Sequence, residues 1–519
     1  MVPVRGHLAI MVRMRLSRLA SPILLVALAA GVMFFRLADK ALWNDEAFSF
    51  FVARGGIAAT VRFIAQDTQP PVYYLALSQW LRLGHGIFAL RALSALAMAL
   101  AVAPLYGAAR RLVDARTATI AGILFALTPM VANWAQKARA YALQTFLLSI
   151  AFWGFAVIFT APEARRDWIG QGLLRAARTR DPRAAVTDLG WLAVGLGGGL
   201  AMLTQQPAGF FLLGLNVAVA LAALPQLAGR WRWLANWTVS QLLVIAVWLT
   251  WLPWFLAQIR TNLTPAQIVL RHTNFLTSWG GVIANLQGLF GVSSLWRAAP
   301  LFLAVQLVVA VLGAVALIRA GRAIPVLVPL LVPPIVCAAG FWLIHPVFGY
   351  VIGEFVFSWL PYAVLLAAAA SGARPRVAAI ALVTMILAGD LWGLRNYYES
   401  PNQPTDRVAA VIRGRMRPGD GVILSDNVAM RWVLAYYLGP ARQTALAGLD
   451  ISAEWDFDRL IRTLPVALRQ KRDWVVLPGG QPSSVPLASL RARMRQVSVD
   501  HIGEATVLLF ARKTVANRS

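Results

Sequence analysis

The sequence is poor in cysteine and in charge. Its single cysteine, Cys337, lies inside an apolar run, so neither an intramolecular disulfide nor a cluster of metal-binding thiolates can form. Charged residues make up 13% of the chain, about half the share found in an average soluble protein. Both shortages argue against a disulfide-stabilised secreted domain and against a soluble protein of ordinary composition.

Signatures of several enzyme classes are also missing. The chain contains no Walker loop, no GxSxG elbow and no dinucleotide-binding fingerprint. His85, His272 and His345 are far apart and lack the i, i+4 spacing of a zinc-binding helix. The sequence therefore offers no recognisable nucleotide site and no histidine-based metal site.

Apolar runs of about 20 residues, the length at which a helix crosses a bilayer, fill the chain up to about residue 394. Much of the net charge of +26 lies in the short loops between them, where arginine marks the cytoplasmic side of a membrane and does not indicate nucleic-acid binding. The alternation predicts a polytopic α-helical membrane protein with about 11 transmembrane helices, an uncleaved first helix and a cytoplasmic N-terminus. An odd number of spans places the C-terminus outside.

The composition changes near residue 395. Strand-length apolar segments such as GVILSD and WVVLPG alternate with amphipathic helical stretches such as MRWVLAYYLG. This alternation predicts a small C-terminal α/β domain. We therefore expect two domains, a transmembrane domain over 1–394 and an outward-facing domain over 395–519.

Acidic residues on the outer side concentrate in the first outer loop. No aspartate or glutamate occurs between Asp188 and Glu354. The stretch LWNDEAFS places Asp45 and Glu46 side by side just after the first span, where a carboxylate is costly and is a functional candidate by default. The alternative is an ordinary hydrated loop. The outward-facing acids of the membrane part are Asp39, Asp45, Glu46, Asp67, Glu354 and, depending on the end of the last span, Asp390.

Cations occupy the other outer loops. Lys137 and Arg139 lie in one short loop beside Tyr141, although cations are under-represented on the outer side. Arg260 and Arg271 lie in a longer loop and fit lipid headgroups as well as a substrate. An acid facing cations suits one chemistry, because the acid can deprotonate a hydroxyl while the cations hold a departing phosphate.

Four segments together resemble a known superfamily, namely LWNDEAFS, QPPVYYLALSQW, ALRALSAL and ALTPMVANWAQKARAYAL. They are similar to the GT-C glycosyltransferases of the protein-mannosyltransferase and lipid A aminoarabinose-transferase superfamily (glycosyltransferase family 39), in particular to its bacterial branch. The resemblance continues through WLPWF, HPVF…LPYAVLLA and YY…DRVAAVIRGRMRPGDGVIL, and so covers nearly the whole chain.

The resemblance implies a transferase that moves a monosaccharide from a polyprenyl-phosphate donor to an envelope acceptor on the periplasmic face of a bacterial inner membrane. The acceptor would be lipid A, lipopolysaccharide core, another glycan, a lipid or a protein. Asp45 matches the family's catalytic acid, with Glu46 beside it. Arg139 and Tyr141 match the arginine and tyrosine of the second outer loop, and Gln69-Pro70-Pro71 stands where the family often has His-Pro-Pro.

Two positions depart from the family pattern. Lys137 stands where many relatives have glutamate, and Glu354 stands where many have arginine. An ion pair between Lys137 and Glu354 would explain both changes. Loss of the second-loop carboxylate weakens a divalent-metal site, so we expect no cofactor and no tightly bound metal. The candidate substrate-binding residues are Gln69, Lys137, Arg139, Tyr141, Arg271 and Glu354.

Two other functions remain open at this point. A transporter or lipid-linked-glycan flippase shares the many spans, although such a protein needs charges in both halves of its path, and residues 189–353 lack acids. An O-antigen-ligase-like enzyme would keep the chemistry and change the donor. Membrane lipids are expected partners, whereas nucleic acid is not. The sugar and the acceptor are not specified by the sequence.

Overall fold

The structure is a computed structural model. It describes residues 21–262, 279–343, 352–372, 374–400, 404–424, 431–439, 472–477, 491 and 494–512. The chain forms two compact units. The helical unit comprises Met1–Leu37 and Ile64–Ser400, and the sheet unit comprises Ala38–Phe63 and Pro401–Ser519.

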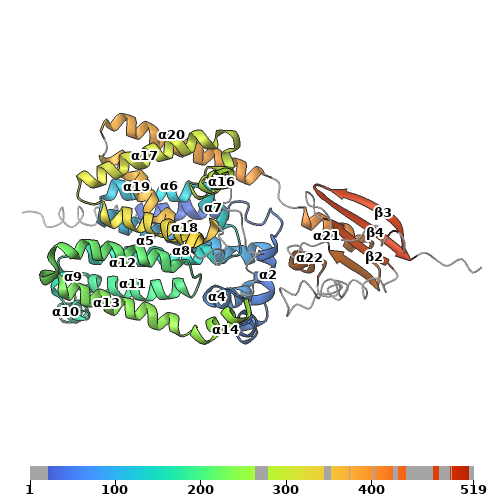
Figure 1. The fold of residues 1–519 in the computed structure, drawn as a ribbon, viewed down its shortest axis with the longest axis horizontal. Helices are drawn as coiled ribbons and strands as arrows, with labels where there is room; N and C mark the ends of the chain where they lie inside the picture. The colour runs from blue at the N-terminus through green and yellow to red at the C-terminus, as the bar shows by residue number, and fades with distance from the viewer. Residues whose placement is uncertain are drawn as a thin grey trace, which may run out of the picture. The chain divides into compact units, whose positions relative to one another are not determined.

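In its described residues, the helical unit is built from α-helices and short 3₁₀ turns (Figure 1). It begins with a helix at Ser21–Phe34. The following helices are α4 (Val72–Trp80), α5 (Ile87–Leu112), α6 (Ala115–Leu127), α7 (Pro129–Ala135), α8 (Tyr141–Thr160), α9 (Glu163–Arg166), α10 (Gln171–Thr179), α11 (Val186–Met202), α12 (Ala208–Ala223), α13 (Leu227–Leu249), α14 (Leu252–Asn262), α16 (Trp279–Leu289), α17 (Ala299–Arg319), α18 (Ile324–Leu343), α19 (Trp359–Gly372) and α20 (Arg376–Glu399). Short 3₁₀ turns, among them η5 (Ile352–Ser358), join some of them.

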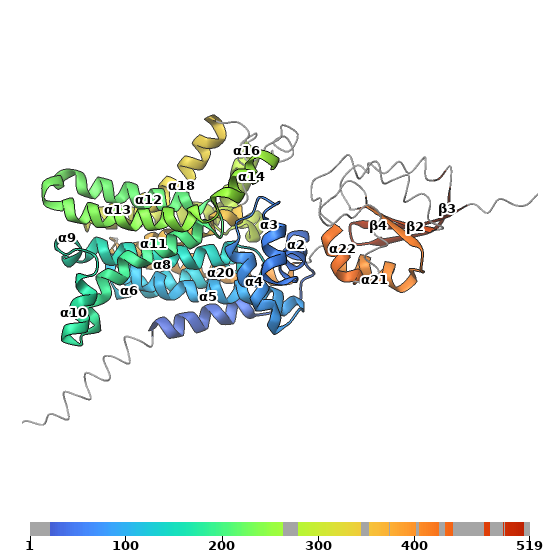
Figure 2. The same ribbon diagram turned by 90° about the horizontal axis from the view of Figure 1, so that it is seen from below.

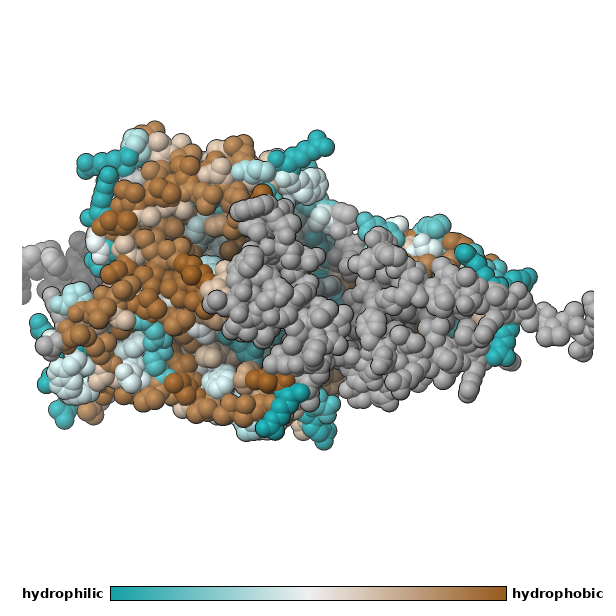
Figure 3. Space-filling model, viewed as in Figure 1, coloured by the Kyte–Doolittle hydropathy of each residue, from teal (hydrophilic) through white to brown (hydrophobic). Residues whose placement is uncertain are grey.

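Many of these helices have the length and composition of membrane spans. Within the described residues, six are long and apolar enough to cross a bilayer, and counting each of two bent pairs as one span gives up to eight. Three shorter apolar helices occur at Ser21–Phe34, Ala208–Ala223 and Ile324–Ala339. Apolar side chains cover much of the visible face of this unit, and polar ones gather towards its ends (Figure 3). The chain is therefore a multi-pass helical membrane protein, as predicted.

Small residues allow the central helices to approach closely. A Cβ atom added to Gly154 of α8 would lie 2.5 Å from the carbonyl oxygen of Gly190 in α11, so only glycine fits this crossing. Close contact through small residues replaces the hydrophobic driving force that is lacking inside a lipid bilayer. Helix α8 packs on both α5 and α11, and α11 packs on α13. Among the long spans of the described residues, the segment from η5 to α19 is the most enclosed, because 89% of an apolar 18-residue stretch within it is buried.

The two ends of the helical unit carry different short elements. Helices α9 and α10 lie at one end, and α4 lies at the other (Figures 1 and 2). Helix α8 runs between these ends, from Tyr141 to Thr160. Its 20 residues span about 30 Å, the thickness of the hydrocarbon core.

The sheet unit combines the tail with residues 38–63, which follow the first apolar helix. Its elements are α2 (Asn44–Ala53), most of α3 (Gly56–Ile64), α21 (Thr405–Arg415), β1 (Asp420–Leu424), α22 (Arg431–Leu438), β2 (Arg472–Leu477), β3 (Met494–Ile502) and β4 (Ala505–Arg512). The strand order is β1-β2-β4-β3, with β1 parallel to β2 and the other neighbours antiparallel. A parallel pair requires a crossover connection, and α22 lies within it. The sequence did not predict that residues 38–63 would belong with the tail.

Candidate functional site

Asp45 and Glu46 lie in the first turn of α2 and have different surroundings. Trp43 is the N-cap residue and has an extended backbone conformation. The Oε2 atom of Glu46 accepts a hydrogen bond of 3.0 Å from the backbone N–H of Trp43, and Glu46 is only 1% exposed. This pairing satisfies a backbone donor at the helix start. Asp45 is half-buried in the same first turn of the helix.

Helix α22 of the tail holds α2 in place. The backbone N–H of Leu42 donates to the Tyr437 hydroxyl at 2.8 Å, and the backbone N–H of Trp432 donates to Asn44 Oδ1 at 3.2 Å. The Trp432 ring, 1% exposed, has its centre 5.6 Å from that of Phe48 and 5.4 Å from that of Phe51. Burying large aromatic side chains contributes strongly to packing. Backbone hydrogen bonds and aromatic ring contacts with α22 thus both hold the segment that carries Asp45.

Residues 136–140, which the sequence predicts to be the second outer loop, lie between α7 and α8 in the helical unit. Thr128 and Pro129 end α6 and start α7, and the two helices bend by 59°. Arg139 follows in the turn before α8 and is only 7% exposed. Its Nη1 atom donates to the Tyr74 hydroxyl at 3.3 Å, and its guanidinium lies 5.9 Å from the centre of the Tyr141 ring. The sequence thus places a buried cation at one end of the membrane-crossing helices.

Trp134 connects the other candidate residues of this unit. The Nζ atom of Lys137 lies 4.1 Å from the centre of the Trp134 indole, within range of a cation–π interaction. The Tyr141 ring meets the same indole edge to face, with centres 5.0 Å apart. A Cβ atom on Gly353 would lie 2.7 Å from this indole, so the residue before Glu354 packs directly against it. The positions of Lys137 and Glu354 therefore converge on one side chain that the sequence did not single out.

Glu354 also contacts a buried glutamine, which contacts a second one through its backbone. Gln205 Nε2 donates to Glu354 Oε1 at 3.1 Å, and Gln144 Nε2 donates to the backbone carbonyl oxygen of Gln205 at 3.2 Å. Both glutamines are buried, at 4% and 0% exposure. A glutamine within an apolar span is itself a signal, because a buried amide requires partners. That signal could have identified Gln144 from the sequence.

The remaining predicted site residues fall elsewhere. Gln69 is half-buried in the bend before α4, which the Val72 N–H anchors to the Leu203 carbonyl oxygen at 2.9 Å. Asp67, two residues earlier, is buried. Arg271 lies outside the described residues. Asp45 and Glu46 belong to the sheet unit, whereas Gln69, Lys137, Arg139, Tyr141 and Glu354 belong to the helical unit. Among the residues that the structure describes, no three His, Cys, Asp or Glu side chains are grouped as metal ligands would be.

Over 94% of its length, the chain is similar in fold to a solved structure, that of ArnT. ArnT from Cupriavidus metallidurans in the apo state superposes with a TM-score of 0.56 at 14% identity, covering 94% of this chain and 97% of that one. ArnT bound to undecaprenyl phosphate gives 0.57 at 15% identity with the same coverage. The chain has the fold of ArnT. The predicted resemblance is therefore confirmed at the level of the fold.

The match to a sequence family covers a shorter part of the chain than the match to the ArnT structure does. The family model described as dolichyl-phosphate-mannose-protein mannosyltransferase matches residues 68–178. That region contains Gln69, Lys137, Arg139 and Tyr141. A comparison with curated proteins finds no match. The likeness to ArnT, which covers 94% of the chain, extends well beyond the family match.

Proposed function

We propose that this protein transfers a monosaccharide from a polyprenyl-phosphate donor to a hydroxyl of an envelope acceptor on the periplasmic face of a bacterial inner membrane. The observation that carries the proposal is the buried guanidinium of Arg139 at the end of membrane-crossing helices. A fixed cation at that depth suits a phosphate attached to a membrane lipid. The ArnT fold, solved in that protein with undecaprenyl phosphate, supports the same donor class.

The reaction assigns one role to each candidate residue. The Asp45 carboxylate accepts the proton of the acceptor hydroxyl, and the resulting oxygen attacks the anomeric carbon with inversion. The bond from that carbon to the phosphate oxygen breaks, and polyprenyl phosphate leaves with the electron pair. Arg139 and Lys137 stabilise the negative charge on the leaving phosphate. Tyr141, Gln69 and Arg271 would contact the donor, and Glu354 would hold Lys137 in place. No metal is assigned a role.

The membrane arrangement is part of the proposal. We propose that, within the described residues, each of the six long helices, the two bent pairs and the three shorter apolar helices crosses the membrane, which would give the expected eleven spans. With an arginine-rich cytoplasmic side, an odd number places the tail in the periplasm. We propose that 395–519 is the predicted periplasmic α/β domain, and that it contributes to acceptor choice while its helix α22 supports α2.

The decisive experiment compares two neighbouring acids in reconstituted membranes. Labelled polyprenyl-phosphate sugars and an envelope lipid extract would be supplied to wild type, Asp45→Asn and Glu46→Gln. Asp45→Asn should reduce transfer by about 10²–10⁴-fold while donor binding is retained. Glu46→Gln should lose less, because its amide oxygen can still accept the Trp43 N–H.

Other outcomes redirect the assignment. Undiminished transfer by Asp45→Asn would move the base to Glu46, Asp67 or Glu354. A diphosphate-linked glycan as the only accepted donor would favour the O-antigen-ligase-like reaction. Transport of a lipid-linked glycan by wild type, without transfer from any donor, would contradict the proposed function and favour the flippase.

A further inference from the structure

A surface at the α9–α10 end of the helical unit has no role in the proposed reaction. We call it the α10 surface and define it by four exposed apolar side chains and six arginines. The apolar members are Trp168, Leu173, Leu174 and Trp231. The arginines are Arg165, Arg166, Arg175, Arg178, Arg180 and Arg183, all exposed.

Helix α10 turns an apolar face away from the protein. Its residues Gly172 and Ala176 face inward, whereas Leu173 and Leu174 are 43% and 59% exposed. At 3.6 residues per turn, Arg175 and Arg178 project from the flank beyond Leu174. A helix of a soluble protein directs its apolar stripe into the core. Here the apolar stripe faces outward beside the cations, which is the pattern of a helix that lies in a membrane interface.

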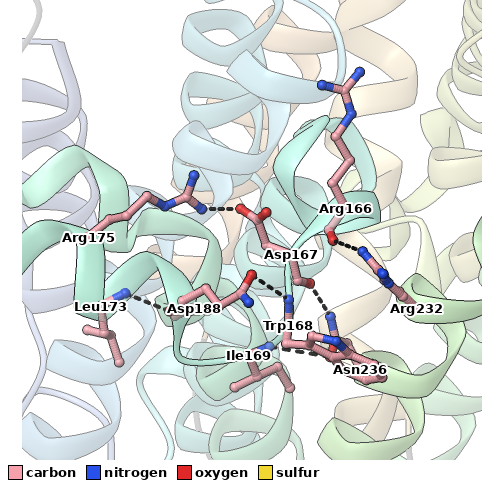
Figure 4. Close-up of polar contacts among 10 residues, drawn as sticks. Arg166, Asp167, Trp168, Ile169, Leu173, Arg175, Asp188, Arg232 and Asn236 are labelled. Atoms are coloured by element: carbon pink, nitrogen blue, oxygen red, sulfur yellow. Dashed lines mark hydrogen bonds and ion pairs between the residues drawn. The ribbon is translucent and has the colours of Figure 1, made fainter.

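The α10 surface is connected by hydrogen bonds to the first turn of α11 and to α13 (Figure 4). Asp188 of α11 accepts a hydrogen bond of 2.7 Å from the backbone N–H of Leu173. Asn236 of α13 donates to the Asp167 carbonyl oxygen at 2.8 Å. Arg175 forms an ion pair with the Asp167 side chain. Because α11 and α13 fix its position, α10 has a defined depth relative to the apolar surface of the unit.

Two tryptophans extend the apolar face of this surface. Trp168 and Trp231 meet at a centre-to-centre distance of 5.3 Å and remain 40% and 53% exposed. Arg232 lies 5.4 Å from the Trp231 ring centre. Tryptophan is enriched where a membrane meets water, since its ring is apolar and its N–H is polar. Exposed side chains of this size grouped together mark an interaction site.

The charge of the surface identifies the partner. Residues 161–183 contain six arginines and three acids, Glu163, Asp167 and Asp181. Asp167 is paired with Arg175, and Asp181 accepts from the backbone N–H of Arg183. Burial, and then the positive charge of Arg230, lower the pKa of Arg165, which indicates that like charges are held close together here. Such a cluster attracts anions.

We propose that the α10 surface binds anionic phospholipid headgroups. Leu173 and Leu174 enter the acyl-chain boundary, and the arginines contact lipid phosphates. The surface is separated by the length of α8, about 30 Å, from the Lys137–Arg139 loop, so it meets the opposite leaflet. The arginine pattern predicts that this leaflet is cytoplasmic, where anionic lipids gather in many membranes. If these arginines served only to orient the protein in the membrane, positive charge alone would be sufficient. An ordered helix with exposed leucines would not be needed.

Depth measurements on the full chain test the membrane contact. In a Cys337→Ser background, Leu174→Cys and Thr179→Cys would each be labelled with a fluorophore and placed in vesicles containing phosphatidylglycerol brominated on its acyl chains. Thr179 lies on the polar side of α10 and serves as the matched control. Strong quenching at Leu174 and weak quenching at Thr179 are expected. Equal, weak quenching at both positions would overturn the proposal.

Lipid dependence tests the headgroup contact. The thermal unfolding midpoint would be followed as phosphatidylglycerol replaces phosphatidylcholine around wild type, Arg178→Gln/Arg183→Gln, and the control Arg407→Gln/Arg495→Gln on the sheet unit. The rise in midpoint should be at least halved in the first double variant and kept in the second. Equal rises in both would overturn the proposal. So would an equal rise from inorganic phosphate in neutral lipid, since the site would then serve a soluble anion.

Discussion

The backbone N–H of Leu42 donates a hydrogen bond of 2.8 Å to the hydroxyl of Tyr437, across 395 positions of sequence. Asp45, the predicted base, lies three residues after Leu42. Tyr437 belongs to α22, whose Trp432 also packs on Phe48 and Phe51 of α2. The tail therefore supports the predicted catalytic helix itself, in addition to any contact that it makes with an acceptor.

Replacing Tyr437 with phenylalanine tests this support. Tyr437→Phe removes the acceptor of the Leu42 N–H and should reduce the free energy of unfolding by about 1 kcal/mol. It should also lower kcat severalfold with little change in donor KM, because the position of Asp45 is affected and the donor site is not. Steady-state transfer kinetics at several donor concentrations would separate the two parameters.

Tyr436→Phe is the matched control for that variant. Tyr436 packs against Phe50 with ring centres 5.0 Å apart, and a phenylalanine ring preserves this contact. Its kcat should stay closer to the wild-type value than that of Tyr437→Phe. Equal losses in the two variants would indicate general loosening of α22 rather than a specific effect through Leu42.

Arg139→Lys should weaken the donor site while keeping its charge. The guanidinium can contact Tyr74 and a phosphate at the same time, whereas an ammonium lacks this planar, forked arrangement of donors. We expect donor KM to rise about tenfold, or ~1.4 kcal/mol of binding free energy. Tyr74→Phe should give a smaller rise. Donor binding measured without acceptor would check both values, and an unchanged affinity of Arg139→Lys would contradict the assignment.

Exchange of charge between Lys137 and Glu354 tests the proposed ion pair. Both positions adjoin Trp134, through the Lys137 ammonium and through Gly353. Lys137→Glu and Glu354→Lys should each reduce transfer at least tenfold, since each leaves two like charges near one indole. The double variant should recover part of that loss. A double variant no more active than the poorer single variant would count against the pair.

The sheet unit should lose stability as pH rises, because of Asp473. Burial, and then the charge of Asp420, raise the pKa of this carboxyl to about 7, against the opposing effect of Arg512. In the unfolded chain the pKa is near 3.9. Between pH ~4 and about 7, the folded state therefore binds more protons than the unfolded state. The stability that the Asp473 carboxyl contributes is fully present below pH ~4 and is lost as pH rises through about 7.

Asp473→Asn removes that titration. Amide hydrogen exchange in β2 should then be slower than in wild type well above pH 7, and nearly equal to it near pH ~4. Glu504→Gln, an exposed acid in the β3–β4 turn, is the control and should leave the exchange rates unchanged at both pH values. A pH-independent difference between wild type and Asp473→Asn would contradict the titration.

The apolar runs predicted the helices well because a span is apolar on all sides and needs no periodic pattern for its detection. The sequence also placed Lys137 and Arg139 correctly in a short turn between helices. It could not identify Trp134 and Tyr74 as the neighbours of these two cations, nor Gln205 as a neighbour of Glu354. Those contacts depend on how helices pack, and one tryptophan among 20 has no local signature.

The change in composition near residue 395 follows the order of the chain, whereas the compact units also group Ala38–Phe63 with the tail. The stretch Ala38–Phe63 is short and aromatic, which is also typical of a loop that lies on a membrane surface. Its pairing with Trp432 is a contact across 388 positions, and no local pattern encodes it. The roles of all the candidate site residues stay predictions until transfer is measured.

The sheet unit is assembled from the two extremes of the chain, and this dictates when it can form. During synthesis, α2 leaves the ribosome early, whereas its partner α22 emerges only after the last membrane-crossing helix has been made. Until then the aromatic side chains of α2 have no Trp432 to pack against. A nascent chain that has not yet made α22, or a chain truncated before it, would therefore lack the contacts that hold the segment carrying Asp45. Under the proposed reaction, such a chain would keep the cations proposed to bind the donor but would gain the ability to transfer only after α22 has been made.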